Sequence, residues 1–215
     1  MRMMKMAIAL AVLTGCSTAA IAQTGGSSTP PLARTDAQQS EHQPDQSTSA
    51  PLDAQREKQA LRIFLRSVQE QIVSAAEAMP ATKYEFTPTE GEFKNVRTFA
   101  RQVRHLSATN LILAAAALGE EPPRDAGDEN GPETVRTKAE ILDYLNSSFA
   151  HLGKAIDAIG EPNASVKASP ISPLPASKTT RLALTVEALI HAFDHYGQMV
   201  EYLRMNGVVP PASRP

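Results

Sequence analysis

Four long segments in which apolar residues recur every three or four positions constrain the fold of this chain more than any other feature. That spacing is typical of a helix with one buried face. Ala and Leu are plentiful and Trp is absent, which favours helices over a β-sandwich. We therefore expect an all-α fold, a four-helix bundle, with helices over residues 53 to about 79, 99–118, from Thr137 to 159, and from Thr179 or Thr180 to 206.

Residues typical of helix ends flank the first two segments. Asp53 is expected to cap the first helix, and Pro80 stops it. Thr98 is expected to cap the second helix, and Gly119 to end it in the left-handed conformation. The polar connections 81–97 and 120–136 on either side of this helix are both long. They allow a crossover connection, but the pattern alone does not fix the topology.

The last two segments carry similar signals. Thr137–Glu140 matches a capping box, in which a Thr and a Glu three residues later satisfy each other's backbone N–H groups. Gly160 is expected to end this third helix. Thr179 or Thr180 is expected to cap the fourth helix, and Gly207 to end it.

The N-terminal 22 residues read as a secretory signal. Two basic residues precede the apolar run Met6–Leu13, which is too short to span a bilayer. Two processing sites compete. Leu13–Cys16 resembles a bacterial lipobox, cut before Cys16, which would then be lipidated; Ala20–Ala22 resembles an A-x-A site, cut before Gln23. Either cut predicts an exported protein, located in the periplasm or lipid-anchored in the cell envelope.

Residues 23–52 form a polar stretch rich in Pro, Ser and Gln, which we interpret as a disordered tether. The folded domain is then expected over residues 53–215. Cys16 is the only cysteine, so this domain has no disulfide and no thiolate ligand. A net charge of −2 gives no basic footprint for nucleic acid. Membrane contact is expected only through an N-terminal lipid.

Histidines give the strongest chemical signal. His191 and His195 are four residues apart, so a helix places both on one face. Imidazole is the commonest metal ligand in proteins, and two from one helix supply half of a tetrahedral site. His105, on the second segment, has apolar neighbours. Such surroundings suit either a buried, hydrogen-bonded ring or a metal ligand. His151 is interpreted as a surface residue. The spacing alone leaves a metal site and ordinary hydrogen-bonded histidines both open.

The fourth segment is apolar on two sides of a helical wheel. A helix of this kind needs two sets of neighbours, its own bundle on one side and a partner, such as a second copy in a homodimer, on the other. The sequence does not decide which side is which. One side carries Leu182, Val186, Leu189, Phe193, Tyr196 and Val200, and the other carries His191 and His195 with Leu184, Ala188, Met199 and Tyr202.

Two segments resemble motifs of a known family. Residues 98–106, TFARQVRHL, look like the second-helix motif of the DinB-like (YfiT-like) superfamily of metal-dependent proteins, which is distinct from the similarly named polymerase. Residues 191–213, beginning HAFDHYGQM, look like its fourth-helix and C-terminal signature. The resemblance covers roughly residues 53–213. It implies a four-helix bundle with a long crossover after the second helix.

The resemblance also implies a divalent metal held by one histidine of the second helix and two of the fourth, which match His105, His191 and His195. Zinc, nickel and iron all suit three imidazoles. Family members often dimerise, and some are transferases or isomerases that use low-molecular-weight thiols. The exported location predicted here departs from those thiol-using members, which are cytosolic.

Two classes of function follow. Three histidines leave coordination positions open, as in catalytic zinc sites, which suits a hydrolase or thiol-type transferase acting on a small substrate. The alternative is a non-catalytic bundle that binds a metal or small molecule in the envelope. Gln198 is a candidate partner of a ligand, and Tyr202 either orients substrate or packs with its hydroxyl satisfied. Asp194 is expected to be solvated, and the sequence shows no clear catalytic base.

Overall fold

The computed structural model describes residues 50–124, 126–160 and 163–214. In these ranges the chain is all-α, as predicted, and its only β pairing is an isolated bridge between Ser165 and Thr180. Short 3₁₀ helices lie at Ala81–Lys83 (η2), Ala176–Lys178 (η3) and Pro211–Ser213 (η4). The four α-helices are α1 (Ala50–Ala78), α2 (Phe99–Leu118), α3 (Lys138–Asp157) and α4 (Arg181–Met205).

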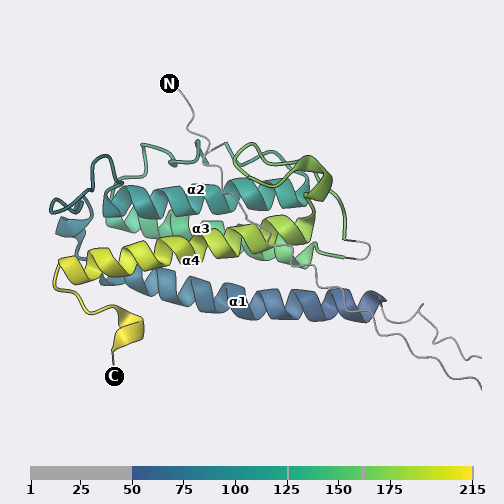
Figure 1. Cartoon of the computed structure of the whole chain (residues 1–215), viewed down its shortest axis with the longest axis horizontal. Coiled ribbons are helices and arrows are strands. Elements are labelled where there is room, and N and C mark those ends of the chain that lie inside the picture. The colour runs from purple at the N-terminus through teal and green to yellow at the C-terminus, as the bar shows by residue number, and fades with distance from the viewer. Residues whose placement is uncertain (1–49, 125, 161–162, 215) are drawn as a thin grey trace, which may run out of the picture. The chain divides into compact units, whose positions relative to one another are not determined.

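The helices form a bundle in which α1 and α4 run in one direction and α2 and α3 in the other (Figure 1). The Arg181 side chain, at the start of α4, donates hydrogen bonds to the carbonyls of Ala117 and Ala158, at the ends of α2 and α3. Because α2 and α3 end at the same end of the bundle, the loop 119–137 has to return along the bundle's length. The crossover after the second helix is therefore present, as the resemblance implied.

The helix caps form largely as the sequence predicts. Thr98 accepts a hydrogen bond from the Arg101 N–H, and Gly119 adopts a left-handed conformation with φ 78°. Both hydrogen bonds of the Thr137 capping box are present. Thr180, rather than Thr179, caps α4. These local signals fix where the helices that carry the site begin and end.

Two helix boundaries differ from the prediction. Helix α1 begins at Ala50, so Asp53 lies inside it rather than at its cap. Pro51 falls in its first turn, where the missing N–H of proline costs nothing. Helix α3 ends at Asp157, because the Ile159 N–H bonds to the Ile156 carbonyl and tightens the final turn into 3₁₀ geometry. Gly160, the predicted terminator, therefore lies beyond the helix.

The packing of α4 shows which of its two apolar sides faces the bundle. Leu184, Ala188 and Met199, on the histidine side, are fully buried. On the other side, Phe193 is 43% exposed, and the neighbouring Ile190 is 66% exposed. The histidines thus point into the bundle, towards α2.

None of the helices in the described ranges has the length and apolar content needed to cross a bilayer. The predicted signal segment, Cys16, both cleavage sites and the tether up to residue 49 lie outside the described residues.

Candidate metal centre

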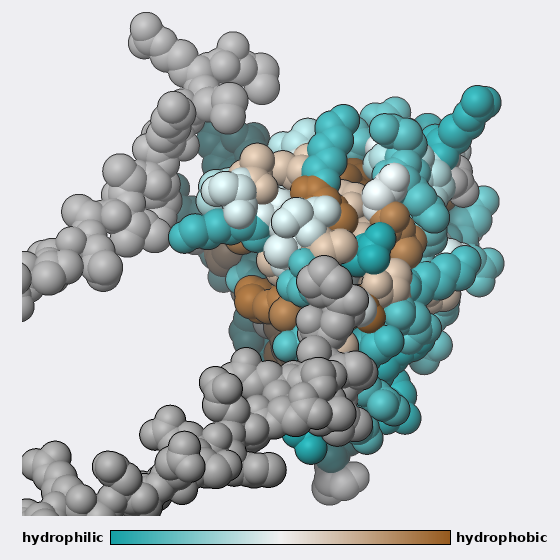
Figure 2. Space-filling model, turned by 90° about the vertical axis from the view of Figure 1, so that its right-hand side faces the viewer, coloured by the Kyte–Doolittle hydropathy of each residue, from teal (hydrophilic) through white to brown (hydrophobic). Residues whose placement is uncertain are grey.

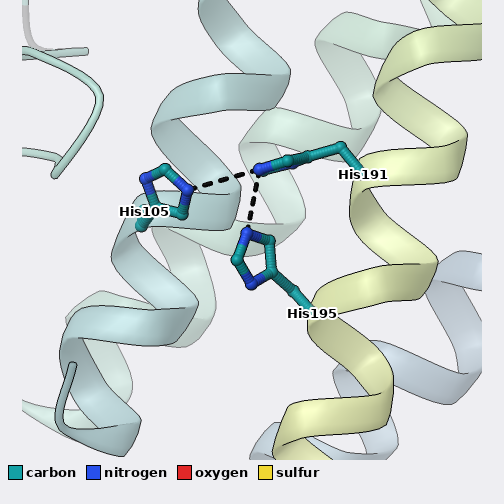
Figure 3. Close-up of side chains that lie close together, drawn as sticks. All are labelled: His105, His191 and His195. Carbon is teal, nitrogen blue, oxygen red and sulfur yellow. Dashed lines mark hydrogen bonds between the residues drawn. The ribbon is translucent and has the colours of Figure 1, made fainter. Parts of the chain in front are cut away.

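Three imidazoles meet between α2 and α4 (Figure 3). The Nε2 atom of His191 lies 3.3 Å from Nε2 of His105 and 2.8 Å from Nε2 of His195. One ring nitrogen from each of the three lies within 4.8 Å of the others. The structure therefore brings together the three histidines that the sequence singled out, with the same ring nitrogen of each pointing inwards.

The helices position these rings in a simple way. His191 and His195 are one turn apart on the inner side of α4, and His105 faces them from the middle of α2. The α2 sequence around His105 is small and apolar, with Ala108 fully buried and Ile112 only 7% exposed. Small residues let the two helices approach closely enough for rings from both to meet.

The crossover loop orients His105. Its Nδ1 contacts the backbone carbonyl of Glu129, in the loop between α2 and α3. A carbonyl only accepts hydrogen bonds, so Nδ1 carries the proton and Nε2 keeps a free lone pair directed at the other rings. A second contact from α2 holds the same loop, since Arg104 donates to the carbonyl of Pro132 at 3.2 Å.

Gln102 orients His195, and sequence reasoning missed it. Its side-chain nitrogen contacts Nδ1 of His195 and donates to Gln198 Oε1 at 2.8 Å. Gln198 in turn donates to the exposed carboxylate of Asp194 at 2.9 Å. Gln102 is only 2% exposed, and its position three residues before His105 on one helical face was the available signal.

Electrostatics keep the rings neutral. Burial, followed by the charges of His105 and Arg97, lowers the pKa of His191 to about 4, although Asp194 opposes this shift. Burial and the two neighbouring histidines lower the pKa of His195 to about 3. Burial also lowers the pKa of His105. Neutral imidazole is the form that binds metal ions, so at pH 7 these rings need lose no charge to do so.

The donor set fits a divalent transition-metal ion. Nitrogen ligands at 2.0–2.1 Å around a tetrahedral ion lie about 3.3–3.4 Å apart, close to the 3.3 Å between His105 and His191. The 2.8 Å between His191 and His195 is a hydrogen-bond distance, so one of those two nitrogens carries a proton when no ion is bound. Backbone and amide groups behind two of the rings are the usual supports of metal-binding histidines.

The other predicted residues have structural roles. The Tyr202 hydroxyl donates to the carbonyl of Arg97 at 3.0 Å, and its ring packs edge-on to Phe86. This matches the packing interpretation, with the hydroxyl satisfied. Gln198 reaches the centre only through Gln102. His151, expected at the surface, is half-buried, and its Nε2 is buried without a hydrogen-bond partner among the described residues. The surface interpretation of His151 is therefore correct only in part, since the residue keeps some exposure while this nitrogen is buried.

Two cavities flank the centre along the bundle. One, of about 680 Å³, has a mixed lining, in which Gln102, Arg97 and Asn130 are polar and Phe93 and Met205 are apolar. The other, of about 550 Å³, is bordered by His105 and His191 and is mostly apolar. Glu129 is exposed and also lines this second cavity, and its carboxylate is near enough to His105 to oppose the lowering of that ring's pKa. The sequence had not revealed this carboxylate near the histidines. The second cavity gives small molecules access to His105 and His191, whereas the first reaches Gln102, which lies behind His195.

Comparison with known proteins adds one finding. A family model described as the DinB superfamily matches residues 65–199, which is more than half of the chain and includes all three histidines. No curated protein matches the chain.

Proposed function

Because the chain belongs to the DinB superfamily and presents three converging imidazoles, we propose that His105, His191 and His195 hold a divalent transition-metal ion. We propose further that the protein is a metal-dependent enzyme, a hydrolase or thiol-type transferase acting on a small substrate. The observation that carries the proposal is the convergence of the three Nε2 atoms, each on a neutral ring.

The ion would supply Lewis acidity, which activates water or a thiol or polarises a carbonyl. Residues of the chain would support the ligands, take up a proton and bind the substrate. Glu129 holds His105 through its backbone carbonyl, it lines the cavity beside that ring, and its carboxylate acts electrostatically on His105. A carboxylate in that place suits a general base that takes a proton from the attacking group. Arg97 lines the opposite cavity, where its positive charge suits an anionic part of the substrate.

Metal content tests the first half of the proposal. The chain purified without added metal is expected to carry about one ion, identified as zinc, nickel or iron by elemental analysis. His105→Ala, His191→Ala and His195→Ala should each abolish stoichiometric binding. His151→Ala is the matched control, since it removes an imidazole outside the centre, and it should keep full content. Full metal content in His105→Ala would remove the three-histidine site.

A non-catalytic metal-binding bundle is the second candidate. The observation in its favour is that Asp194, the carboxylate nearest the histidine pair in sequence, is exposed and bonded to Gln198. A screen of the metal-loaded chain on esters, amides and thiol-transfer substrates separates the two. Turnover that falls in Glu129→Gln while metal content stays full supports the enzyme. Stoichiometric metal without turnover supports the binding protein.

We also propose that the chain is exported. The support is the basic N-terminus, the apolar run Met6–Leu13 and the two processing sites that follow. The N-terminus of the mature protein decides between the cuts by mass spectrometry. A lipid-modified Cys16 identifies an envelope lipoprotein, and Gln23 as first residue identifies a free periplasmic protein. A mature chain that retains Met1 contradicts export.

A further inference from the structure

The apolar cavity beside the metal centre has a lining unlike that of any other surface near the histidines. It is built from α2, α4, the loop that precedes α4 and Glu129 of the crossover loop. Figure 2 faces the end of the bundle where α2 ends and α4 begins, and brown apolar residues gather there between pale and teal side chains. The apolar walls of the cavity are Leu113, Ile171, Leu174, Val186 and Ile190.

We propose that this cavity binds an apolar group of the substrate, a short alkyl chain or a single aromatic ring, while a polar atom of the same molecule meets the metal. This inference rests on the proposed metal site, because His105 and His191 form one border of the cavity. A molecule seated on the apolar walls therefore lies next to His105 and His191.

The contrast with the cavity on the Arg97 side indicates where an apolar group binds. Arg97, Arg101 and Asn130 line the cavity on the other side of the centre, where an apolar group would displace water from charged side chains. When a ligand removes the apolar walls of the His105–His191 cavity from water, the free energy of the complex is lowered. The His105–His191 side is thus the more favourable place for an apolar group.

The loop wall is held in place before any ligand arrives. The Ser172 hydroxyl donates to the Glu187 carboxylate of α4 at 2.6 Å and accepts from the Leu174 N–H at 3.1 Å. These two bonds fix the segment that carries Ile171 and Leu174 against α4. A preformed wall lets a ligand bind without ordering the loop. The volume of about 550 Å³ lies within the range of small-molecule sites.

One buried polar group points to a ligand that is more than a hydrocarbon. Thr109 lines the cavity, and its hydroxyl is buried without a hydrogen-bond partner among the described residues. Buried hydroxyls are usually satisfied, so a ligand with a polar atom at the base of its apolar group would complete the site.

Binding of linear hydroxamates of increasing length to the Co²⁺-loaded chain tests the proposal. The hydroxamate group ligates the ion, and the alkyl chain probes the cavity. We expect the dissociation constant, measured by calorimetry, to fall about fourfold for each added methylene from acetohydroxamate to hexanohydroxamate. A flat series, with acetohydroxamate still bound, overturns the inference and leaves the metal site intact.

A matched pair of variants locates the effect. Ile190→Ser alters an exposed wall residue of the cavity, and Ile63→Ser alters another exposed isoleucine, on α1, that lies outside it. Ile190→Ser should reduce the gain per methylene, and Ile63→Ser should leave it unchanged. Equal effects of the two variants contradict the assignment.

A neutral probe tests the apolar cavity in the absence of a metal ion. Hexanol added to the metal-free chain should shift the amide NMR signals of Leu174 and Ile190 more than that of Ile63. Shifts confined to other regions overturn the apolar site, whether or not the chain binds metal. Failure of every hydroxamate together with shifts at Leu174 and Ile190 overturns the metal site alone.

Discussion

The side-chain amide of Gln102 on α2 contacts Nδ1 of His195 on α4, directly behind the candidate metal centre. To bind an ion through Nε2, His195 must carry its proton on Nδ1, and a hydrogen-bond acceptor must face that proton. An amide presents either its oxygen or its nitrogen on a half-turn, so Gln102 is able to serve His195 with or without an ion.

Gln102→Leu should therefore weaken metal binding by about 10–100-fold, the usual effect of losing a group that orients a histidine ligand. Gln102→Glu keeps an acceptor for the Nδ1 proton and should retain most of the affinity. Competition with a chromophoric chelator at pH 7.5 measures both. The exposed Gln59 of α1 supplies the control variant, Gln59→Leu, which should bind metal as the unmodified chain does. Unchanged affinity in Gln102→Leu would show that the contact has no orienting role.

Gly131 in the crossover loop should be intolerant of a side chain. Its φ is 74°, and a Cβ there would lie 3.0 Å from the backbone oxygen of Arg104. Gly131→Ala should destabilise the domain by more than the roughly 1–2 kcal/mol of left-handed strain alone. It should also weaken metal binding, because Glu129 two residues earlier supports His105.

Gly119→Ala is the matched control for this loop. Gly119 has a similar φ of 78°, but a Cβ there meets nothing within 4 Å. In urea denaturation the control should lose only the stability that left-handed strain costs. It should keep normal metal affinity. Equal losses of stability and affinity in the two variants would contradict a role for the loop contact.

Tyr84 should make stability depend on alkaline pH. Burial, then the charge of Glu77, raises the pKa of its hydroxyl above the usual 10.0, and this hydroxyl donates to the Ala76 carbonyl. Below about pH 10 the folded and unfolded chains both keep the proton, so the stabilisation is complete. Above it the unfolded chain ionises while the folded chain does not, and stability is lost as pH rises.

Tyr84→Phe removes that group. The variant should be less stable by about 1 kcal/mol at pH 8, the usual net worth of a hydrogen bond. The difference from the unmodified chain should shrink between pH 9 and 11, as measured by urea denaturation at each pH. A difference that stays constant across this range would show that Tyr84 does not titrate on unfolding.

The outward side of α4 predicts self-association. Phe193 is 43% exposed, and Tyr196 on the same side is only partly buried. A second copy of the chain would cover this apolar side. Sedimentation equilibrium should then show a dimer at micromolar concentration, and Phe193→Glu should convert it to a monomer with an unchanged helical CD spectrum. A monomer at all concentrations rules this interface out.

Much of the bundle was predictable because its signals are local. Thr98, Gly119 and the Thr137 capping box act within one helical turn, and each forms as expected. The start of α1 was misplaced because Asp53 is a good cap by composition, while a proline at position 51 suits the first turn equally well. The residue types at positions 51 and 53 fit either start of α1, so the sequence does not decide between them.

The site was only half predictable. His191 and His195 are a local pair, but joining His105 to them needed the family resemblance, since no local spacing relates α2 to α4. Gln102 resembles any polar helix residue until its neighbours are known. Glu129 supports His105 through a backbone carbonyl, and every residue has one, so no sequence pattern marks it.

His105 is 86 residues away from His191, and the whole crossover and α3 lie between them. A nascent chain that still lacks α4 offers an ion only one of the three converging imidazoles, which is too few ligands for stable capture at this site. Loading of the proposed ion would therefore follow completion of the polypeptide. For a chain threaded unfolded through a translocation pore, loading also follows transport. The metal supply outside the cytosol, and not the pools inside it, would then determine which ion this protein carries.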